Sequence, residues 1–236
     1  MSGFDPSYIF TALGKLVTAL PVVLLILILS MSAGMILGLL FTIIRLKRIP
    51  VLHYIVSILI SFLRGTPQIV QLFLVYYGIP QVLRNMGIEV SVENRVLFVV
   101  ITFSLNSSAT FSEAFRGAYM AVEPGQMEAT WSIGMTGFQG FRSVIFPQAF
   151  RVLLPNLGNL AIRMLQATSL AFSIGVVDLM GRAKIIDDWT YGVNRLAIYI
   201  AVSLIYWGIC LLLEFVIHRL EKAYSFGHVH LSKVRG

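Results

Sequence analysis

Two arginines lie inside long apolar runs of the sequence, where a charged side chain is costly. Arg64 interrupts the run 51–83, and Arg163 lies about eleven residues into the run 152–180, hence about 16 Å deep at ~1.5 Å per helical residue. A guanidinium at such a depth normally faces a cavity or a partner molecule. We expect no acidic residue of the chain at a matching depth. The chemistry predicted for both arginines is therefore the binding of carboxylates through paired hydrogen bonds.

Polar side chains on the same runs are candidates to complete such a site. Arg64 has a second interpretation, because residues 65–67 (Gly-Thr-Pro) predict a break in the helix. There the guanidinium could instead cap the carbonyl groups that the break leaves free, and this role is favoured for Arg64. The predicted ligand-binding residues are Arg64, Gln71, Asn106, Arg163, Gln166, Thr168 and Ser169.

The composition excludes most soluble proteins. Of the 236 residues, 57% are hydrophobic and only 12% are charged, about half the charged share of an ordinary soluble domain. The net charge of +7 comes from basic residues near the ends of apolar runs, where they fix topology, rather than from a nucleic-acid-binding patch. A single cysteine, Cys210, excludes an internal disulfide. No Cys/His spacing predicts a metal site, and His228 and His230 belong to a polar tail.

Five apolar runs approach or exceed the roughly 20 residues that a membrane span needs. The first contains Ser30, Gly34 and Gly38, spaced by four, a pattern that allows another helix to approach closely but also fits simply tolerated glycines. The predicted fold class is an all-α membrane protein whose whole chain, 1–236, is one transmembrane domain. The spans are predicted at 16–44, 51–83, 95–120, 152–180 and 191–217.

The distribution of basic residues predicts an external N-terminus and a cytoplasmic C-terminus. Arg45, Lys47 and Arg48 follow the first span directly, whereas only Lys15 precedes it. Residues 181–190 are expected to form a short outer loop. The basic residues that place the C-terminus inside are Arg219, Lys222, Lys233 and Arg235.

The segment 121–147 is too polar and too broken by glycine and proline to span a membrane, and the topology places it in the cytoplasm. Pro124 and Gly125 can begin a short helix, which Gly134 or Gly137 can end. A helix this short is marginal alone in water, so it needs a surface to dock on.

Within this segment the sequence resembles a known family. Residues 128–130 (Glu-Ala-Thr), Gly134 and residues 144–147 (Val-Ile-Phe-Pro) resemble the cytoplasmic loop of ABC importer permeases. Residues 62–67 (Phe-Leu-Arg-Gly-Thr-Pro), 113–117 (Glu-Ala-Phe-Arg-Gly) and 168–171 (Thr-Ser-Leu-Ala) resemble the polar amino-acid branch of that family. The resemblance covers roughly residues 15–222, with the motifs in order.

The resemblance implies a type I importer with a cytoplasmic coupling helix that docks on an ATPase. It implies two permease subunits, the same or related chains, two ATPase subunits that bind the ATP and Mg²⁺, and an external amino-acid-binding protein, all at a bacterial cell membrane. The chain agrees on one point, because it has no phosphate-binding loop of the Gly-x-x-x-x-Gly-Lys-[Ser/Thr] type and so is not expected to be an enzyme. The residues expected to couple transport to the ATPase are Glu128, Ala129, Trp131 and Gly134.

Two other functions remain open at this point. A stand-alone transporter driven by an ion gradient would often carry a mid-membrane acid and an internal repeat, whereas a scaffold protein would leave the polar third span unexplained. For an importer, an amino acid with two carboxylates fits two cations best, such as cystine, glutamate or aspartate. Relatives more often have a small residue where this chain has Arg163, and the chain as a whole looks most like the cystine members.

Overall fold

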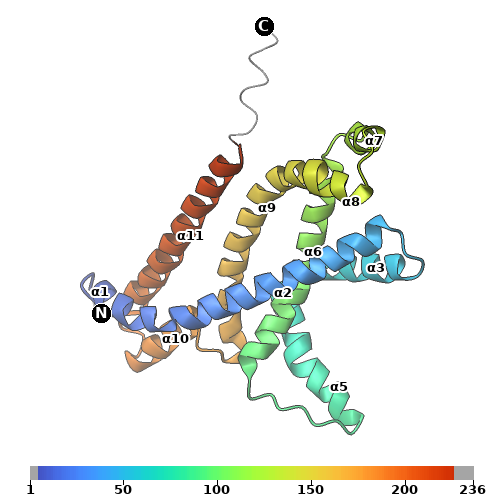
Figure 1. Cartoon of the computed structure of the whole chain (residues 1–236). Helices are drawn as coiled ribbons and strands as arrows, with labels where there is room; N and C mark the ends of the chain where they lie inside the picture. The colour runs from blue at the N-terminus through green and yellow to red at the C-terminus, as the bar shows by residue number, and fades with distance from the viewer. Residues whose placement is uncertain (1–4, 226–236) are drawn as a thin grey trace.

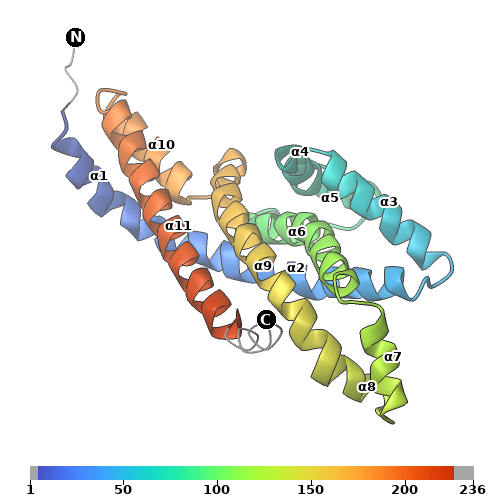
Figure 2. The ribbon, with the colours of Figure 1, turned by 90° about the horizontal axis from the view of Figure 1, so that it is seen from above.

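The computed structural model describes residues 5–225, and this part of the chain is helical without strands. Four residues of the predicted tail, His228, His230, Lys233 and Arg235, lie outside the described residues. Figures 1 and 2 show long helices that cross one another, with two short helices set apart at one end of the molecule.

The first span is longer than predicted. Helix α1 (Tyr8–Leu16), a 3-10 turn (Val17–Ala19) and α2 (Leu20–Leu46) follow one another without a loop and form 39 continuous helical residues. Pro21 does not end the helix because the 3-10 turn before it lets the Leu20 N–H bond to the Val17 carbonyl oxygen, which a helical residue 21 would otherwise use. At ~1.5 Å per residue the rod measures about 58 Å, well beyond a hydrocarbon core of about 30 Å.

The second span is broken where the sequence predicts. Helix α3 (Leu52–Gly65) ends before Pro67, and α4 (Gln68–Phe73), a π-helical turn (Leu74–Gly78) and α5 (Ile79–Asn85) continue at an angle of 113° to it. Thr66 and Pro67 adopt extended backbone, as expected of a proline and the residue before it. The break turns the chain sharply instead of kinking a single rod.

Helix α6 (Arg95–Met120) covers the third predicted span and packs along α2. The stripe of Ser30, Gly34 and Gly38 faces this contact, since all three residues are buried. A Cβ atom on Gly38 would lie 2.6 Å from the Phe111 Cβ and 2.9 Å from the Ser108 carbonyl oxygen, and one on Gly34 would collide with the Ser107 side chain. The glycines therefore allow the two backbones to approach closely, which confirms the packing interpretation of the stripe.

The segment 121–147 folds as two short helices that lead into the fourth span. Helix α7 (Gly125–Ser132) is followed by α8 (Gly137–Gly140), a π-helical turn (Phe141–Ile145) and α9 (Phe146–Ala167). A 3-10 segment (Thr168–Ile174) then ends at Gly175, whose φ of +82° reverses the chain.

The predicted outer loop 181–190 is wrong, because most of it is helix α10 (Leu179–Trp189). Asp178 caps this helix by accepting a hydrogen bond from the Gly181 backbone N–H at 2.9 Å. Asp187, which reads as a loop residue in the sequence, is instead buried and pairs with Arg195 at 2.9 Å.

Helix α11 (Arg195–Ser225) is the last span. Among residues 5–225, three helices are long and apolar enough to cross a membrane, and the number rises to five if each of the two bent pairs counts as one span. This agrees with the predicted number of spans. The larger core joins α1, α2, α4, α6, α9, the 3-10 segment, α10 and α11. A smaller core joins α2, α3 and α6 around Phe41 and Ile60.

Candidate functional site

A cavity of about 240 Å³ lies between α4, α6 and α9. Two of the predicted ligand-binding residues, Asn106 from α6 and Arg163 from α9, line it together with Gln68 from the first turn of α4. Its other walls come from the same helices: Ser107, Thr110, Phe111, Leu160, Met164 and Ala167. The polar groups thus gather on a mostly apolar lining, as in many small-molecule sites.

Arg163 is the only charged residue of this lining and has no partner within the part of the chain that the structure describes. Its side chain is exposed, and no carboxylate of residues 5–225 lies within 4.0 Å of it. An unpaired guanidinium presents five N–H donors in a planar fork that matches a carboxylate. The cavity can therefore bind an anionic group through two parallel hydrogen bonds.

Gln68 is a site residue that the sequence did not indicate. Its Nε2 atom is buried and has no hydrogen-bond partner among the described residues, although the residue lines the cavity. A buried unpaired amide is costly unless a ligand or water satisfies it. The available signal was its place directly after Pro67, where the broken helix restarts.

Gln71 and Asn106 hold the break in the second span. The Gln71 Nε2 atom donates to the carbonyl oxygens of Leu63 at 2.8 Å and Thr66 at 3.1 Å, and Asn106 Nδ2 donates to Leu63 O at 3.2 Å and to Gln71 Oε1 at 3.0 Å. These amides do the capping that was favoured for Arg64. Gln71 is buried and does not line the cavity, so of the pair only Asn106 lies at the candidate site.

The prediction that Arg64 lacks an acidic neighbour is wrong. Glu113 of α6 lies 3.6 Å from Arg64, and it also binds Arg45 at 2.8 Å and Arg116 at 3.1 Å. The Arg64 side chain is 56% exposed, so it is not a deeply buried cation within this chain. Because the second span turns by 113°, counting residues along a straight helix does not give the place of Arg64 relative to α6.

The remaining predicted ligand-binding residues do not line the cavity. Thr168 is fully buried, and its hydroxyl donates to the Leu165 carbonyl at 2.7 Å. The Ser169 hydroxyl likewise donates to the Gln166 carbonyl at 2.6 Å, and the Gln166 side chain is exposed. The structure therefore brings Asn106 and Arg163 together. It leaves Gln166 in the last turn of α9 and Thr168 and Ser169 on the 3-10 segment that follows.

The predicted coupling residues lie on α7 and the turn after it. Glu128 and Ala129 are exposed, as are the large apolar side chains of Trp131, at 58%, and Ile133, at 71%. An exposed aromatic and aliphatic face on a short helix is typical of a protein-binding surface. Figure 2 shows α7 and α8 projecting from one end of the molecule.

Two local features hold α7 and α8 in place. Thr130 is buried against Gly140, where a Cβ atom would lie 2.5 Å from the Thr130 hydroxyl oxygen. Gly134 has a φ of +80°, with no atom within 4 Å of where its Cβ would be. Glycine is thus needed at 134 for its backbone conformation, which agrees with the expected turn after the short helix.

The sequence profile of a family described as "Binding-protein-dependent transport system inner membrane component" matches residues 32–226. The chain belongs to this family. This permease is 40% identical over 219 residues to the L-cystine transport system permease protein TcyL of Bacillus subtilis, covering 93% of this chain and 91% of that protein. It is 32% identical to the glutamine transport system permease protein GlnP of Escherichia coli, covering 93% and 97%.

Solved structures agree with this assignment. A structure described as an amino acid ABC transporter with histidines matches with a TM-score of 0.81 and 31% identity, covering 94% of the permease and 99% of that chain. The MetNI methionine ABC transporter matches with a TM-score of 0.70 at 19% identity, which shows the shared fold. The chain is therefore a permease subunit of an amino-acid ABC importer, which decides against a stand-alone secondary transporter and a scaffold.

Proposed function

We propose that the permease imports L-cystine and that Arg163 binds a carboxylate of the substrate in the cavity between α4, α6 and α9. The observation that carries this proposal is the unpaired guanidinium of Arg163 in a lining that also holds Asn106 and the unsatisfied amide of Gln68. A carboxylate supplies the acceptors that Arg163 and Gln68 lack, whereas the amide of Asn106 already donates to Leu63 and Gln71.

Cystine carries two carboxylates, so a second cation is expected to bind the carboxylate that Arg163 does not. Arg64 is our candidate, because its contact with Glu113 is long at 3.6 Å and its side chain is 56% exposed. The relatives TcyL and TcyB of Bacillus subtilis, each 40% identical to this permease, are described as L-cystine permeases, which favours cystine over glutamate and aspartate.

The test is Arg163→Ala in the complete importer reconstituted in liposomes with its ATPase and binding protein. We expect uptake of labelled cystine to fall about tenfold or more, because a charge-assisted hydrogen bond contributes roughly 1.5–3 kcal/mol. Arg151→Ala, on the same helix but away from the cavity, is the matched control and should transport normally. Unchanged uptake by Arg163→Ala would refute the role of Arg163, whereas wild-type uptake of glutamate or aspartate in preference to cystine would refute the substrate alone.

We further propose that Glu128, Ala129 and Trp131 dock on one of two ATPase subunits, which hold the ATP and Mg²⁺. A second permease subunit and an external binding protein complete the importer in a bacterial cell membrane, with the N-terminus outside and α7 in the cytoplasm. The exposed apolar residues around Trp131 support this arrangement.

Gly134→Val tests the coupling. Valine at a φ of +80° is strained and should reorient the turn after α7. We expect uptake to fall while the ATPase keeps hydrolysing ATP without import. Gly137→Ala, a glycine with ordinary φ and open space around it, is the control. Wild-type coupling in Gly134→Val would contradict the docking role.

A further inference from the structure

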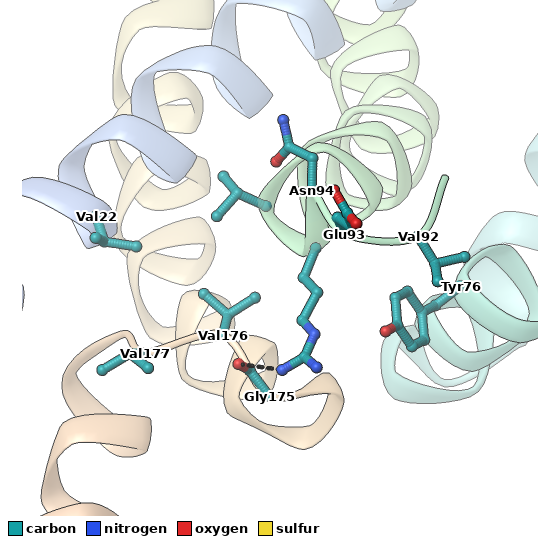
Figure 3. Close-up of a pocket in the computed structure, with 10 residues that line it drawn as sticks. Val22, Tyr76, Val92, Glu93, Asn94, Gly175, Val176 and Val177 are labelled. Atoms are coloured by element: carbon teal, nitrogen blue, oxygen red, sulfur yellow. Dashed lines mark hydrogen bonds between the residues drawn. The ribbon is translucent and has the colours of Figure 1, made fainter. Parts of the chain in front are cut away.

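A second, larger cavity lies at the end of the permease opposite α7. Its volume is about 610 Å³, and it is formed where α6 begins, beside the connection between the 3-10 segment and α10 (Figure 3). Figure 1 shows the beginning of α6 and the helix α10 at the far end of the molecule from α7 and α8. Under the proposed orientation this outer cavity faces the outside of the cell.

One cation of the outer cavity is held in a fixed position. Arg95 Nη1 donates to the Gly175 carbonyl oxygen at 3.0 Å, while the rest of the guanidinium is exposed to the cavity. Glycine is needed at 175 for two reasons. A Cβ atom there would collide with this Nη1, and the φ of +82° is one that other residues rarely adopt. The contact keeps the guanidinium at the wall and leaves its other N–H groups free for a ligand.

The carboxylate of Glu93 lines the same cavity but does not pair with Arg95. Glu93 is exposed, and its carboxylate makes no ion pair within 4.0 Å to any residue in the described range 5–225, Arg95 included. Figure 3 draws Glu93, Tyr76 and the Arg95–Gly175 hydrogen bond among the residues that line this cavity. The cavity thus offers one carboxylate and one guanidinium at separate places.

We propose that the outer cavity binds the free L-amino acid by its α-ammonium and α-carboxylate before transport. Glu93 accepts hydrogen bonds from the ammonium, and Arg95 donates to the carboxylate, since each charge of the zwitterion then meets its opposite. The cavity recognises the groups that all L-amino acids share, so selection between side chains occurs elsewhere. This inference depends on the amino-acid permease family and not on cystine or on Arg163.

The single cysteine of the chain allows a direct test. In a Cys210→Ser background, Val177→Cys places a thiol on the cavity wall, where the valine is 45% exposed. The rate of alkylation by a membrane-impermeant maleimide is measured in the purified permease–ATPase complex without the binding protein. The probes are L-glutamine and L-cystathionine, whose thioether cannot exchange with the thiol as a disulfide would. Val92→Cys, on the same wall, is a second reporter if Val177→Cys folds poorly.

We expect both amino acids to slow alkylation of Val177→Cys in a saturable manner, and their methyl esters and N-acetyl derivatives to have no effect. Arg95→Gln and Glu93→Gln should each raise the half-protecting concentration about tenfold or more, because each loses a charge-assisted contact. Arg84→Gln on α5, outside the cavity, should leave it unchanged, and Met86→Cys, 70% exposed outside the cavity, should show no protection.

Three outcomes would overturn the proposal. Alkylation could be insensitive to both amino acids, or the esters and acetylated compounds could protect equally. In the third, the binding protein would protect Val177→Cys while the free amino acids did not, and the outer cavity would then be a docking surface for that protein. Because the assay involves neither Arg163 nor uptake, its result is independent of the cystine proposal.

Discussion

The permease contains arginines in two contrasting settings. Arg45, Arg64 and Arg116 share one carboxylate, that of Glu113, at 2.8–3.6 Å, whereas Arg163 lines a cavity with no carboxylate of the described residues in reach. The first group joins α2, α3 and α6, and only its loosest member, Arg64, is also proposed to meet the substrate. The second leaves a guanidinium that no carboxylate of the described residues neutralises and that a ligand can reach. The same side chain therefore stabilises the fold in one place and is available to a ligand in the other, depending on whether a neighbouring helix supplies the counter-ion.

The largest effect is expected from removing the shared carboxylate. Glu113→Gln leaves three guanidinium groups around one position without a negative charge, and Glu113 and Arg45 are mostly buried, at 24% and 17% side-chain exposure. Breaking a fully buried pair costs about 3–5 kcal/mol, so for this partly exposed group we expect about 2–3 kcal/mol of the free energy of unfolding. Thermal unfolding in detergent measures it, with Glu89→Gln, at an exposed position, as the control. Arg163→Ala should leave the midpoint of thermal unfolding nearly unchanged. Equal losses of stability in Glu113→Gln and Arg163→Ala would contradict the distinction between paired and unpaired arginines.

The second prediction turns the free arginine into a paired one. Leu160 lines the cavity one helical turn before Arg163, so Leu160→Glu places a carboxylate next to the guanidinium. Uptake should fall about tenfold or more, as in Arg163→Ala, although the arginine is still present, because the substrate then competes with an internal partner. Leu160→Gln, similar in size but uncharged, should lose much less. If both substitutions reduced uptake equally, the effect would be one of cavity shape.

A smaller effect is expected at the break between α3 and α4. Gln71→Leu removes the donor that satisfies the Leu63 and Thr66 carbonyls and leaves one bond from Asn106 to Leu63. The free energy of unfolding should fall by about 1–3 kcal/mol, as is usual when a buried acceptor loses its partner. Gln81→Leu on α5, whose amide makes only a 3.4 Å bond on the surface, is the control. An unchanged free energy of unfolding in Gln71→Leu would show that water can replace the amide.

The smallest effect is expected from Arg64→Ala. This arginine is 56% exposed and lies 3.6 Å from Glu113, so its contribution should be that of a surface ion pair, below about 1 kcal/mol. Unfolding of Arg64→Ala and Arg45→Ala, compared in one series, separates the loose contact from the close one at 2.8 Å. A greater loss of stability in Arg64→Ala than in Arg45→Ala would mean that the distance to Glu113 does not predict how much each ion pair contributes.

The sequence predicted local structure well wherever the cause was local. The break at residues 65–67 follows from proline chemistry, the boundaries of α6 follow from its flanking polar residues, and the short helix α7 follows from Pro124, Gly125 and Gly134. It failed at residues 181–190, which are polar enough to suggest a loop. Helix α10 forms there because Asp178 caps it and Asp187 pairs with Arg195, a contact that no local pattern reveals.

By itself the sequence determined the class of protein, an all-α amino-acid permease with about five spans, because apolar run length and motif order depend only on the residues. It also pointed to Arg163, which lines a cavity in the structure. Which polar residues share the cavity was decided by the tertiary structure, because the turn of 113° redirects the second span. That turn places Gln68 rather than Gln71 beside Arg163, and Glu113 beside Arg64. Counting along separate helices cannot show how their faces meet, and that meeting distinguishes a paired charge from one available to a ligand.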